Sequence, residues 1–391
     1  MKPASPSPYA AKVRASHYSL WKDCVPLLGR LDFELTERCN SDCIHCCINL
    51  PRDNARARER ELKTAEIQEI LTEAAALGAL SVRFTGGEPL LREDFEDLYL
   101  FSRRLGLKVL LFTNARLITP ELADLFGRIP PLEKIEITVY GMKRQSYEGV
   151  SRVPGSYAEF RRGLDLLLKR GVPFVVKGAL LPPNRGEINA FEEWAASLPA
   201  MDRPPGYSMF FELRCRHDAP AKNRLIESLR PPLEEWVAMF ARRRQSYLQE
   251  MREFCGKFIG PPGDRLFVCG AGRAPCVDAY GALQPCLLLR HPETVYDLKN
   301  GSLKDALTNF FPHLRQAKAT NPDYLARCAR CFLKGLCEQC PAKSWAEHGT
   351  LDTPVEYLCR VAHVQARDLG LIGSGECAWE VENWKERIKR I

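Results

Sequence analysis

Two hydrophobic periods alternate along the first half of the chain. Short apolar runs of strand type are followed by longer stretches in which apolar residues recur every three to four positions, as in amphipathic helices. The pattern predicts strands over 31–35, 79–85, 107–113, 134–140, 174–181 and 207–213, with helices over 64–77, 92–104, 120–126, 156–170 and 187–198. Regular alternation of this kind predicts a parallel sheet built from βαβ units.

Helix boundaries along this half of the chain carry suitable residues. Pro120 and Ser156 fit helix starts, whereas Gly106 and Gly171 fit helix ends. Six predicted strands are too few for a complete eight-stranded barrel. In parallel α/β folds the chemistry lies at the carboxyl ends of the strands, so candidate residues are sought there.

Composition and charge exclude several classes of protein. The chain has 391 residues, of which 45% are hydrophobic and 27% charged, as in ordinary globular proteins with two domains. The net charge of +7 comes without a long basic block, which argues against nucleic acid as a partner. Residues 52–60 hold four arginines, but Asp53 and Glu59 lie among them and a solvated loop is predicted. No apolar run is long enough for a membrane span, and the Pro/Ser-rich start lacks the core of a signal peptide, so we expect a cytoplasmic protein.

Sixteen cysteines are unusual for a cytoplasmic chain, in which structural disulfides are rare. Their clustering near residue 40 and between 255 and 359 indicates metal binding instead. Cys39, Cys43 and Cys46 form a Cys-x3-Cys-x2-Cys motif directly after the first predicted strand. A [4Fe–4S] cluster normally takes four thiolates, so three in one loop would leave one iron open to a substrate or cosubstrate. The alternative is a structural metal site with a distant fourth ligand.

A second motif, Gly86-Gly87-Glu88-Pro89, follows the strand predicted over 79–85. Alone it would indicate a strand-to-loop turn, but together with the cysteine triad it resembles the radical S-adenosylmethionine (radical SAM) family. That resemblance implies a partial (β/α)6 barrel of the TIM type. It also implies a [4Fe–4S] cluster on Cys39, Cys43 and Cys46 as the catalytic centre, and SAM chelated to the open iron. One electron would then cleave SAM to a 5′-deoxyadenosyl radical.

The same resemblance implies further contacts to SAM. Gly86, Gly87, Glu88 and Pro89 would meet its amino group. Asn114, Thr138 and Arg152 stand where relatives bind its carboxylate or ribose, although Tyr140 replaces the usual aspartate. Lys177 and Glu212 could face either a substrate or solvent, because neighbouring strand positions alternate. His45 is predicted only to shape the cysteine loop, and Cys215 to be an inert buried thiol.

The second cysteine region resembles the SPASM extension of radical SAM enzymes, a small domain with two auxiliary [4Fe–4S] clusters. Only the spacing between Cys337 and Cys340 departs from that pattern, by one residue. The resemblance implies that one cluster takes Cys328, Cys331, Cys337 and Cys359. The other would take Cys269, Cys286 and Cys340, with a fourth position that is Cys255, Cys276 or open. Two zinc-ribbon sites are the alternative for this region, because paired Cys-x2-Cys motifs also bind zinc.

These observations predict five segments: an N-terminal segment (1–30), a radical SAM barrel (31–214), a helical linker (215–265), a SPASM domain (266–361) and a helical tail (362–391). The implied function is hydrogen abstraction from a substrate, most often a ribosomally made peptide or protein in such enzymes. A small molecule, such as a sugar, a heme or a cofactor precursor, is the first alternative, and a non-catalytic zinc-ribbon adaptor the second. Expected partners are a low-potential electron donor of flavodoxin or ferredoxin type and a separate peptide-recognition protein.

Overall fold

Six parallel strands form the body of the first domain. A computed structural model describes residues 28–242, 244–258, 262–337 and 339–389. The predicted segment 1–30, apart from its last three residues, lies outside the described residues, as does Cys24. The strands lie side by side in chain order: β1 (Arg30–Thr36), β4 (Ser81–Gly86), β5 (Lys108–Thr113), β6 (Leu132–Val139), β7 (Phe174–Ala179) and β8 (Gly206–Ser208). The predicted α/β fold with a six-stranded, barrel-like parallel sheet is confirmed.

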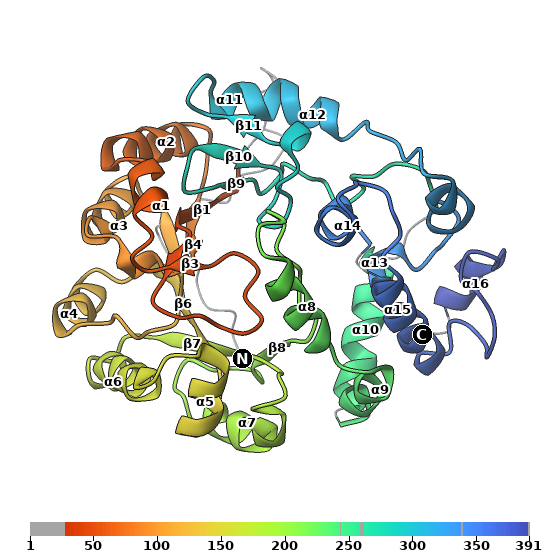
Figure 1. The fold of residues 1–391 in the computed structure, drawn as a ribbon, viewed down its shortest axis with the longest axis horizontal. Helices are drawn as coiled ribbons and strands as arrows, with labels where there is room; N and C mark the ends of the chain where they lie inside the picture. Colours follow the sequence, from red (N-terminus) through yellow and green to blue (C-terminus); the bar gives the residue numbers. More distant parts are fainter. Residues whose placement is uncertain (1–27, 243, 259–261, 338, 390–391) are drawn as a thin grey trace, which may run out of the picture.

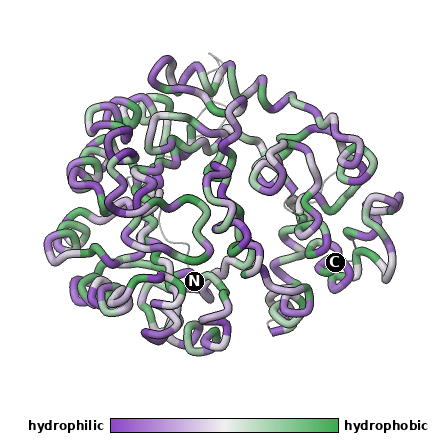
Figure 2. Tube along the Cα trace, in the orientation of Figure 1, coloured by the Kyte–Doolittle hydropathy of each residue, from purple (hydrophilic) through white to green (hydrophobic). Residues whose placement is uncertain are grey.

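Amphipathic helices cover the outer side of this curved sheet (Figure 1). Leu71, Leu98 and Leu164 are buried against it, and Figure 2 shows hydrophobic and hydrophilic residues alternating along these helices. The apolar helix face buries against the sheet because that removes it from water. The helices are α2 (Thr64–Ala76), α3 (Phe95–Arg104), α4 (Pro120–Arg128), α5 (Arg144–Ser151), α6 (Ser156–Lys169) and α7 (Ile188–Ala196).

Three local predictions require correction. The stretch predicted as a solvated loop forms α1 (Ala55–Arg60), because Asn54 caps it and Arg58 and Arg60 lie near its carboxyl end. The last predicted strand shrinks to three residues at the edge of the sheet. Helix α5 was not predicted, because its sequence is mainly polar. Its first turn is capped by Ser146, whose hydroxyl oxygen accepts a hydrogen bond from the Lys143 backbone N–H.

The rest of the chain builds a second lobe, drawn from green to blue in Figure 1. Linker helices α8, α9 and α10 agree with the helical pattern expected after residue 214. None of the described helices has the length and apolar character that a membrane crossing requires. The helices are α8 (Pro220–Ser228), α9 (Leu233–Arg242), α10 (Arg244–Phe258), α11 (Leu303–Asp305), α12 (Phe311–Leu314), α13 (Lys334–Cys337), α14 (Pro341–His348), α15 (Glu356–Asp368) and α16 (Trp384–Ile388). Helix α15 therefore continues across the boundary that the sequence predicts between residues 361 and 362.

A short three-stranded extension joins the cysteine-rich lobe to the barrel. Strand β9 (Cys276–Val277) pairs in parallel with β1, placing Cys276 beside Asp32. Strands β10 (Ala282–Gln284) and β11 (Tyr296–Asp297) continue the sheet in antiparallel pairs. The cysteine-rich lobe is therefore hydrogen-bonded to the first strand of the barrel.

A buried ion-pair network reinforces this junction. Arg290 donates from one nitrogen to both carboxylate oxygens of Glu34, at 2.6 Å each, and lies 3.3 Å from Glu37. Tyr280 and Arg216 also bind Glu37. Burial raises the pKa of Glu34 although Arg290 is beside it, so this carboxylate depends on its partner for its charge. The network binds β1 to the loop that follows Cys286.

Candidate active site

The cysteine triad lies in the loop that leaves the carboxyl end of β1, orange-red in Figure 1. The loop begins at β2 (Arg38–Cys39) and ends at β3 (Leu50–Pro51), which pairs with β2. Burial, together with neighbouring cysteines of the triad, raises the pKa of Cys39 and of Cys43, the latter to about 12. Three thiols that gather in this way need a bound cation to become thiolates, so the donor set fits an iron–sulfur cluster.

Two cations from other parts of the chain hold this loop in place. Arg116, after β5, binds the Asn40 carbonyl and donates to the Ser41 hydroxyl at 2.7 Å. Lys222, on α8, donates to the Cys43 carbonyl oxygen at 2.6 Å. Neither residue could be identified from the amino-acid pattern, because their roles depend on elements that meet only in the folded chain.

Gly86 and Gly87 are required by the backbone that passes beside them. A Cβ atom at Gly86 would lie 2.1 Å from the Thr36 carbonyl oxygen, and one at Gly87 would lie 2.2 Å from that of Arg38. The amides of Gly87 and Glu88 donate to these same two carbonyls, at 2.7 and 2.9 Å. The glycine pair therefore lets β4 end against the start of the cysteine loop.

Glu88 links the ends of two neighbouring strands. Its buried carboxylate accepts hydrogen bonds from the Thr113 hydroxyl and the Asn114 amide, both at 2.8 Å. Burial raises the pKa of Glu88 to about 7 in spite of these donors. The Asn114 side chain in turn donates to Asn40 at 2.7 Å, and Pro89 opens a short 3-10 helix. These candidate SAM residues thus lie together beside the triad.

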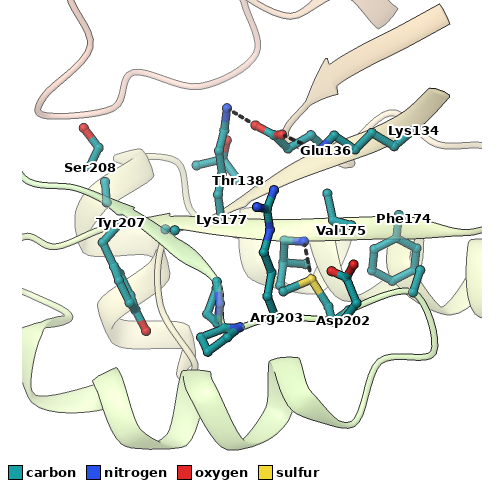
Figure 3. A pocket seen from close by; sticks show the side chains of 18 of the residues that line it. Lys134, Glu136, Thr138, Phe174, Val175, Lys177, Asp202, Arg203, Tyr207 and Ser208 are labelled. Atoms are coloured by element: carbon teal, nitrogen blue, oxygen red, sulfur yellow. Dashed lines mark hydrogen bonds and ion pairs between the residues drawn. The ribbon is translucent and has the colours of Figure 1, made fainter. Parts of the chain in front are cut away.

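A cavity of about 1090 Å³ opens within the barrel (Figure 3). Its walls come from β6, β7, β8 and residues 200–205, and Thr138 and Tyr140 line it near the carboxyl end of β6. His45, between the second and third cysteines, also lines it, so the cavity extends from the barrel interior to the cysteine loop. Burial lowers the pKa of His45 to about 4, and its Nδ1 atom has no hydrogen-bond partner among the described residues. Its place in the cavity wall goes beyond the loop-shaping role expected from the sequence.

Charged side chains cross the interior of the barrel at mid-height. Lys177 and Glu136 form an ion pair at 2.5 Å, seen in Figure 3, and Arg83 lies 3.1 Å from Asp32. The ring of Phe112 lies between the two cations, 3.6 Å from the Lys177 nitrogen and 4.9 Å from the Arg83 guanidinium carbon. Of the two residues whose orientation the sequence left open, Lys177 faces the cavity, whereas Glu212 pairs with Lys343 at 2.5 Å.

Arg152 occupies a different place from the other candidate SAM residues. It ends α5 in a left-handed conformation, with φ of 57°, and its side chain is half exposed. Its guanidinium lies 3.3 Å from Asp42, in the cysteine loop. Arg152 thus borders the triad from outside, and its contact with SAM stays a prediction.

Four cysteines of the second lobe line one small cavity. These are the residues that the resemblance assigned to a single auxiliary cluster: Cys328, Cys331, Cys337 and Cys359. Burial raises the pKa of Cys331 to about 12. In the described ranges, no three His, Cys, Asp or Glu side chains are arranged to hold a metal ion. The four thiols instead surround a shared space, which suits a cluster bound through several irons.

The other three auxiliary cysteines form a second neighbourhood. Cys286 interacts electrostatically with Cys269 and with Cys340. Cys255 packs instead into an apolar cluster with Cys331, and Cys276 faces Glu34 and Arg290 from β9. Cys215, expected to be inert, donates to the Leu288 carbonyl at 3.2 Å, two residues beyond Cys286. Which residue completes this second set stays open.

The chain is similar in sequence to known proteins. The radical SAM superfamily model matches residues 33–195. An AdoMet-dependent heme synthase from Methanosarcina barkeri is 28% identical over 46% of this chain, and the chain spans about half (49%) of that relative's length. The mycofactocin maturase MftC from Mycolicibacterium smegmatis is 26% identical over 77% of this chain and 74% of its own length.

A solved structure shares the fold over both lobes. Native anSMEcpe, with bound AdoMet and the Cp18Cys peptide, has a TM-score of 0.57 at 13% identity. The superposition covers 94% of this chain and all of that one. The match to the radical SAM superfamily supports the enzyme class, the [4Fe–4S] cluster and SAM that the sequence predicted. The likeness to the solved structure confirms the predicted fold. The chain therefore contains a radical SAM domain, which spans residues 33–195.

Proposed function

We propose that this enzyme abstracts hydrogen from a ribosomally made peptide or protein held in the barrel cavity. The observation that carries the proposal is the cavity of about 1090 Å³ that begins at the cysteine loop and continues through the barrel. A space of this size is at the upper end of small-molecule sites, so it can hold both SAM and part of a larger substrate. When bound, the cluster and SAM supply a 5′-deoxyadenosyl radical at the end where His45 lies.

The protein's own residues bind and orient these groups. Cys39, Cys43 and Cys46 would hold the cluster, while Glu88, Asn114 and Thr138 would face SAM, with Arg152 at the edge. Lys177 and Glu136 would contact the substrate, because they line the same cavity as Thr138, and Glu136 lies farther from the carboxyl end of its strand. Cys328, Cys331, Cys337 and Cys359 would hold one auxiliary cluster, and Cys269, Cys286 and Cys340 the other.

Similar proteins favour a peptide over a small molecule. The maturase aligns with this chain through most of both lobes, and the solved structure of anSMEcpe holds a peptide. The heme synthase of Methanosarcina barkeri is slightly more identical but aligns with less than half of the chain. A second heme synthase, from Nitratidesulfovibrio vulgaris, aligns with 84% of the chain at a lower identity of 21%. A small-molecule substrate therefore remains the second candidate. We further propose action in the cytoplasm, where cysteine thiols stay reduced, with a separate peptide-recognition protein.

Anaerobic reconstitution with iron and sulfide tests the proposal. We expect about twelve irons per chain, for three [4Fe–4S] clusters, and 5′-deoxyadenosine on addition of SAM and dithionite. Peptides encoded beside the gene are then offered in parallel with an iron porphyrin, and products are followed by mass spectrometry. A mass change in the porphyrin alone would reject the peptide assignment. Bound zinc, with no 5′-deoxyadenosine formed, would reject the assignment of the protein as an enzyme.

The raised pKa of Glu88 leads to a prediction about stability. Because burial raises the pKa of Glu88 to about 7, we expect the folded chain to keep a proton there up to about pH 7, whereas an unfolded chain releases it near its ordinary pKa of 4.5. Stability contributed by this proton is complete below about pH 4.5 and is lost as the pH rises to 7. The change is at most about 1.4 kcal/mol per pH unit. Glu88→Gln, which cannot ionise, is expected to lack this decline.

Urea unfolding of both proteins between pH 5 and 8, at equal iron content, measures the difference. Glu96→Gln, on the exposed face of α3, is the matched control for the chemical change. Parallel stability curves for the wild type and Glu88→Gln would show that Glu88 is ionised throughout.

A further inference from the structure

The cysteine triad can be approached from two sides. The barrel cavity reaches it through His45, as described above. A second hollow, of about 550 Å³, lies on the outer side of the loop, where Cys39 forms part of its wall. The other walls come from the rest of the cysteine loop, from Arg116 and Leu117 in the connection between β5 and α4, and from the first two turns of α6. The outer hollow therefore gives a path from the surface to the first cysteine without passing through the barrel.

Arginines border this outer hollow. Arg52 and Arg162 line it and are exposed, and Arg56 is exposed on the adjoining helix α1. Among the described residues, none of these three guanidinium groups forms an ion pair. Arg162 donates a hydrogen bond to the Arg116 carbonyl, at 3.1 Å. They are thus available to an external anion.

The acidic residues that line the hollow are already neutralised. Asp42 lies 3.3 Å from Arg152 and 3.4 Å from Lys222. Glu159 lies 2.7 Å from Arg116. The residues that line the hollow are therefore three arginines (Arg52, Arg116 and Arg162) against two paired carboxylates, although Asp53 and Glu59 are exposed nearby in the sequence. Such a lining attracts acidic partners and orients them during encounter.

We propose that this arginine-bordered hollow, with Arg52 and Arg162 in its wall beside Cys39 and Arg56 on the adjoining helix α1, is the docking surface for a small acidic one-electron carrier protein. The proposal rests on the proposed function, because it requires the cluster on Cys39, Cys43 and Cys46. One electron passes from the carrier, which is oxidised, to that cluster, which is reduced, and no bond forms or breaks. Weak electron-transfer complexes have small interfaces, which suits a single hollow with a charged rim.

Comparing two reductants tests the docking surface. The full-length reconstituted enzyme is supplied either with dithionite or with a bacterial flavodoxin reduced by its NADPH-dependent reductase. For the variant Arg52→Glu/Arg56→Glu/Arg162→Glu, we expect flavodoxin-driven formation of 5′-deoxyadenosine to fall about tenfold or more, since steering changes association by about 10–10³-fold. The dithionite-driven rate and the iron content should stay within about twofold of wild type, because a small reductant needs no docking surface.

A control variant separates local charge from total charge. Lys108→Glu/Arg128→Glu/Lys169→Glu makes the same change in net charge on exposed residues at the opposite end of the strands. It should keep both rates. Salt should also slow the wild-type enzyme with flavodoxin more than it slows the triple variant, because screening weakens exposed charge pairs.

Three results would overturn the docking surface. The triple variant could keep its flavodoxin-driven rate, it could lose both rates equally, or the control variant could lose the flavodoxin-driven rate as strongly. Failure of the proposed function is distinguishable, because wild-type enzyme would then form no 5′-deoxyadenosine even with dithionite.

Discussion

Replacing Cys39, Cys43 and Cys46 together by alanine is expected to abolish the reductive cleavage of SAM. Without these thiols no cluster forms in the loop after β1, so neither SAM nor the electron has a site there. About four irons per chain should be lost, and 5′-deoxyadenosine formation with dithionite should fall to background. Iron analysis and chromatography of the SAM products measure both effects.

Cys331→Ala is the matched control, because Cys331 lies in the cavity of the second lobe. It should also lose about four irons, but it should still cleave SAM, since the triad is intact. Turnover of the peptide would then report what the auxiliary cluster contributes. A triple variant that still produced 5′-deoxyadenosine would place the cleavage elsewhere and end the proposed mechanism.

The second large effect is expected for Arg290→Met. This change removes the partner of Glu34, whose side chain is 0% exposed, and leaves the buried carboxyl group uncompensated unless it binds a proton. Breaking a buried pair in this way costs about 3–5 kcal/mol of unfolding free energy. The junction between β1 and the loop after Cys286 should loosen, and proteases should cleave that loop faster.

Urea unfolding and limited proteolysis test this junction. Arg58→Met is the control, because its pair with Glu93 is exposed at 61% and 84% and should contribute no more than about 1 kcal/mol. Adding Glu34→Gln to Arg290→Met should restore part of the stability, since position 34 then carries no charge and Glu37 still has Arg216 as a partner. Equal stability of Arg290→Met and wild type would show that the network does not hold the lobes together.

Much of the barrel follows from the amino-acid pattern because parallel strands and their helices are local, periodic elements. The strands predicted over 31–35 and 107–113 coincide with β1 and β5 to within about two residues, the usual margin at element ends. The last strand was overestimated because the apolar residues Met209, Phe211 and Leu213 are buried in contacts with the second lobe rather than in the sheet.

In the candidate site too, features local in the sequence could be predicted and long-range contacts could not. Motifs within one short segment, such as Cys39 to Cys46 and Gly86 to Pro89, could be recognised from the chain alone. Lys222, Arg116 and Arg290 could not, because each acts on a residue at least 75 positions away. The role of His45 in the cavity wall depends on how the loop folds over the barrel, which no spacing rule describes.

The pairing of β9 with β1 has a consequence for the order of biosynthesis. Arg290 lies 256 positions after Glu34, and Cys276 pairs beside Asp32. A ribosome therefore completes the whole radical SAM barrel, including β4 on one edge of β1, before β9 and Arg290 on the other side have been made. During that interval the first strand has a free edge and Glu34 lacks its cation, which are features that chaperones and aggregating chains bind. Contacts this distant in sequence also slow folding. Stable closure of the cysteine loop, and with it durable insertion of iron and sulfide, should come only after the last third of the chain has emerged.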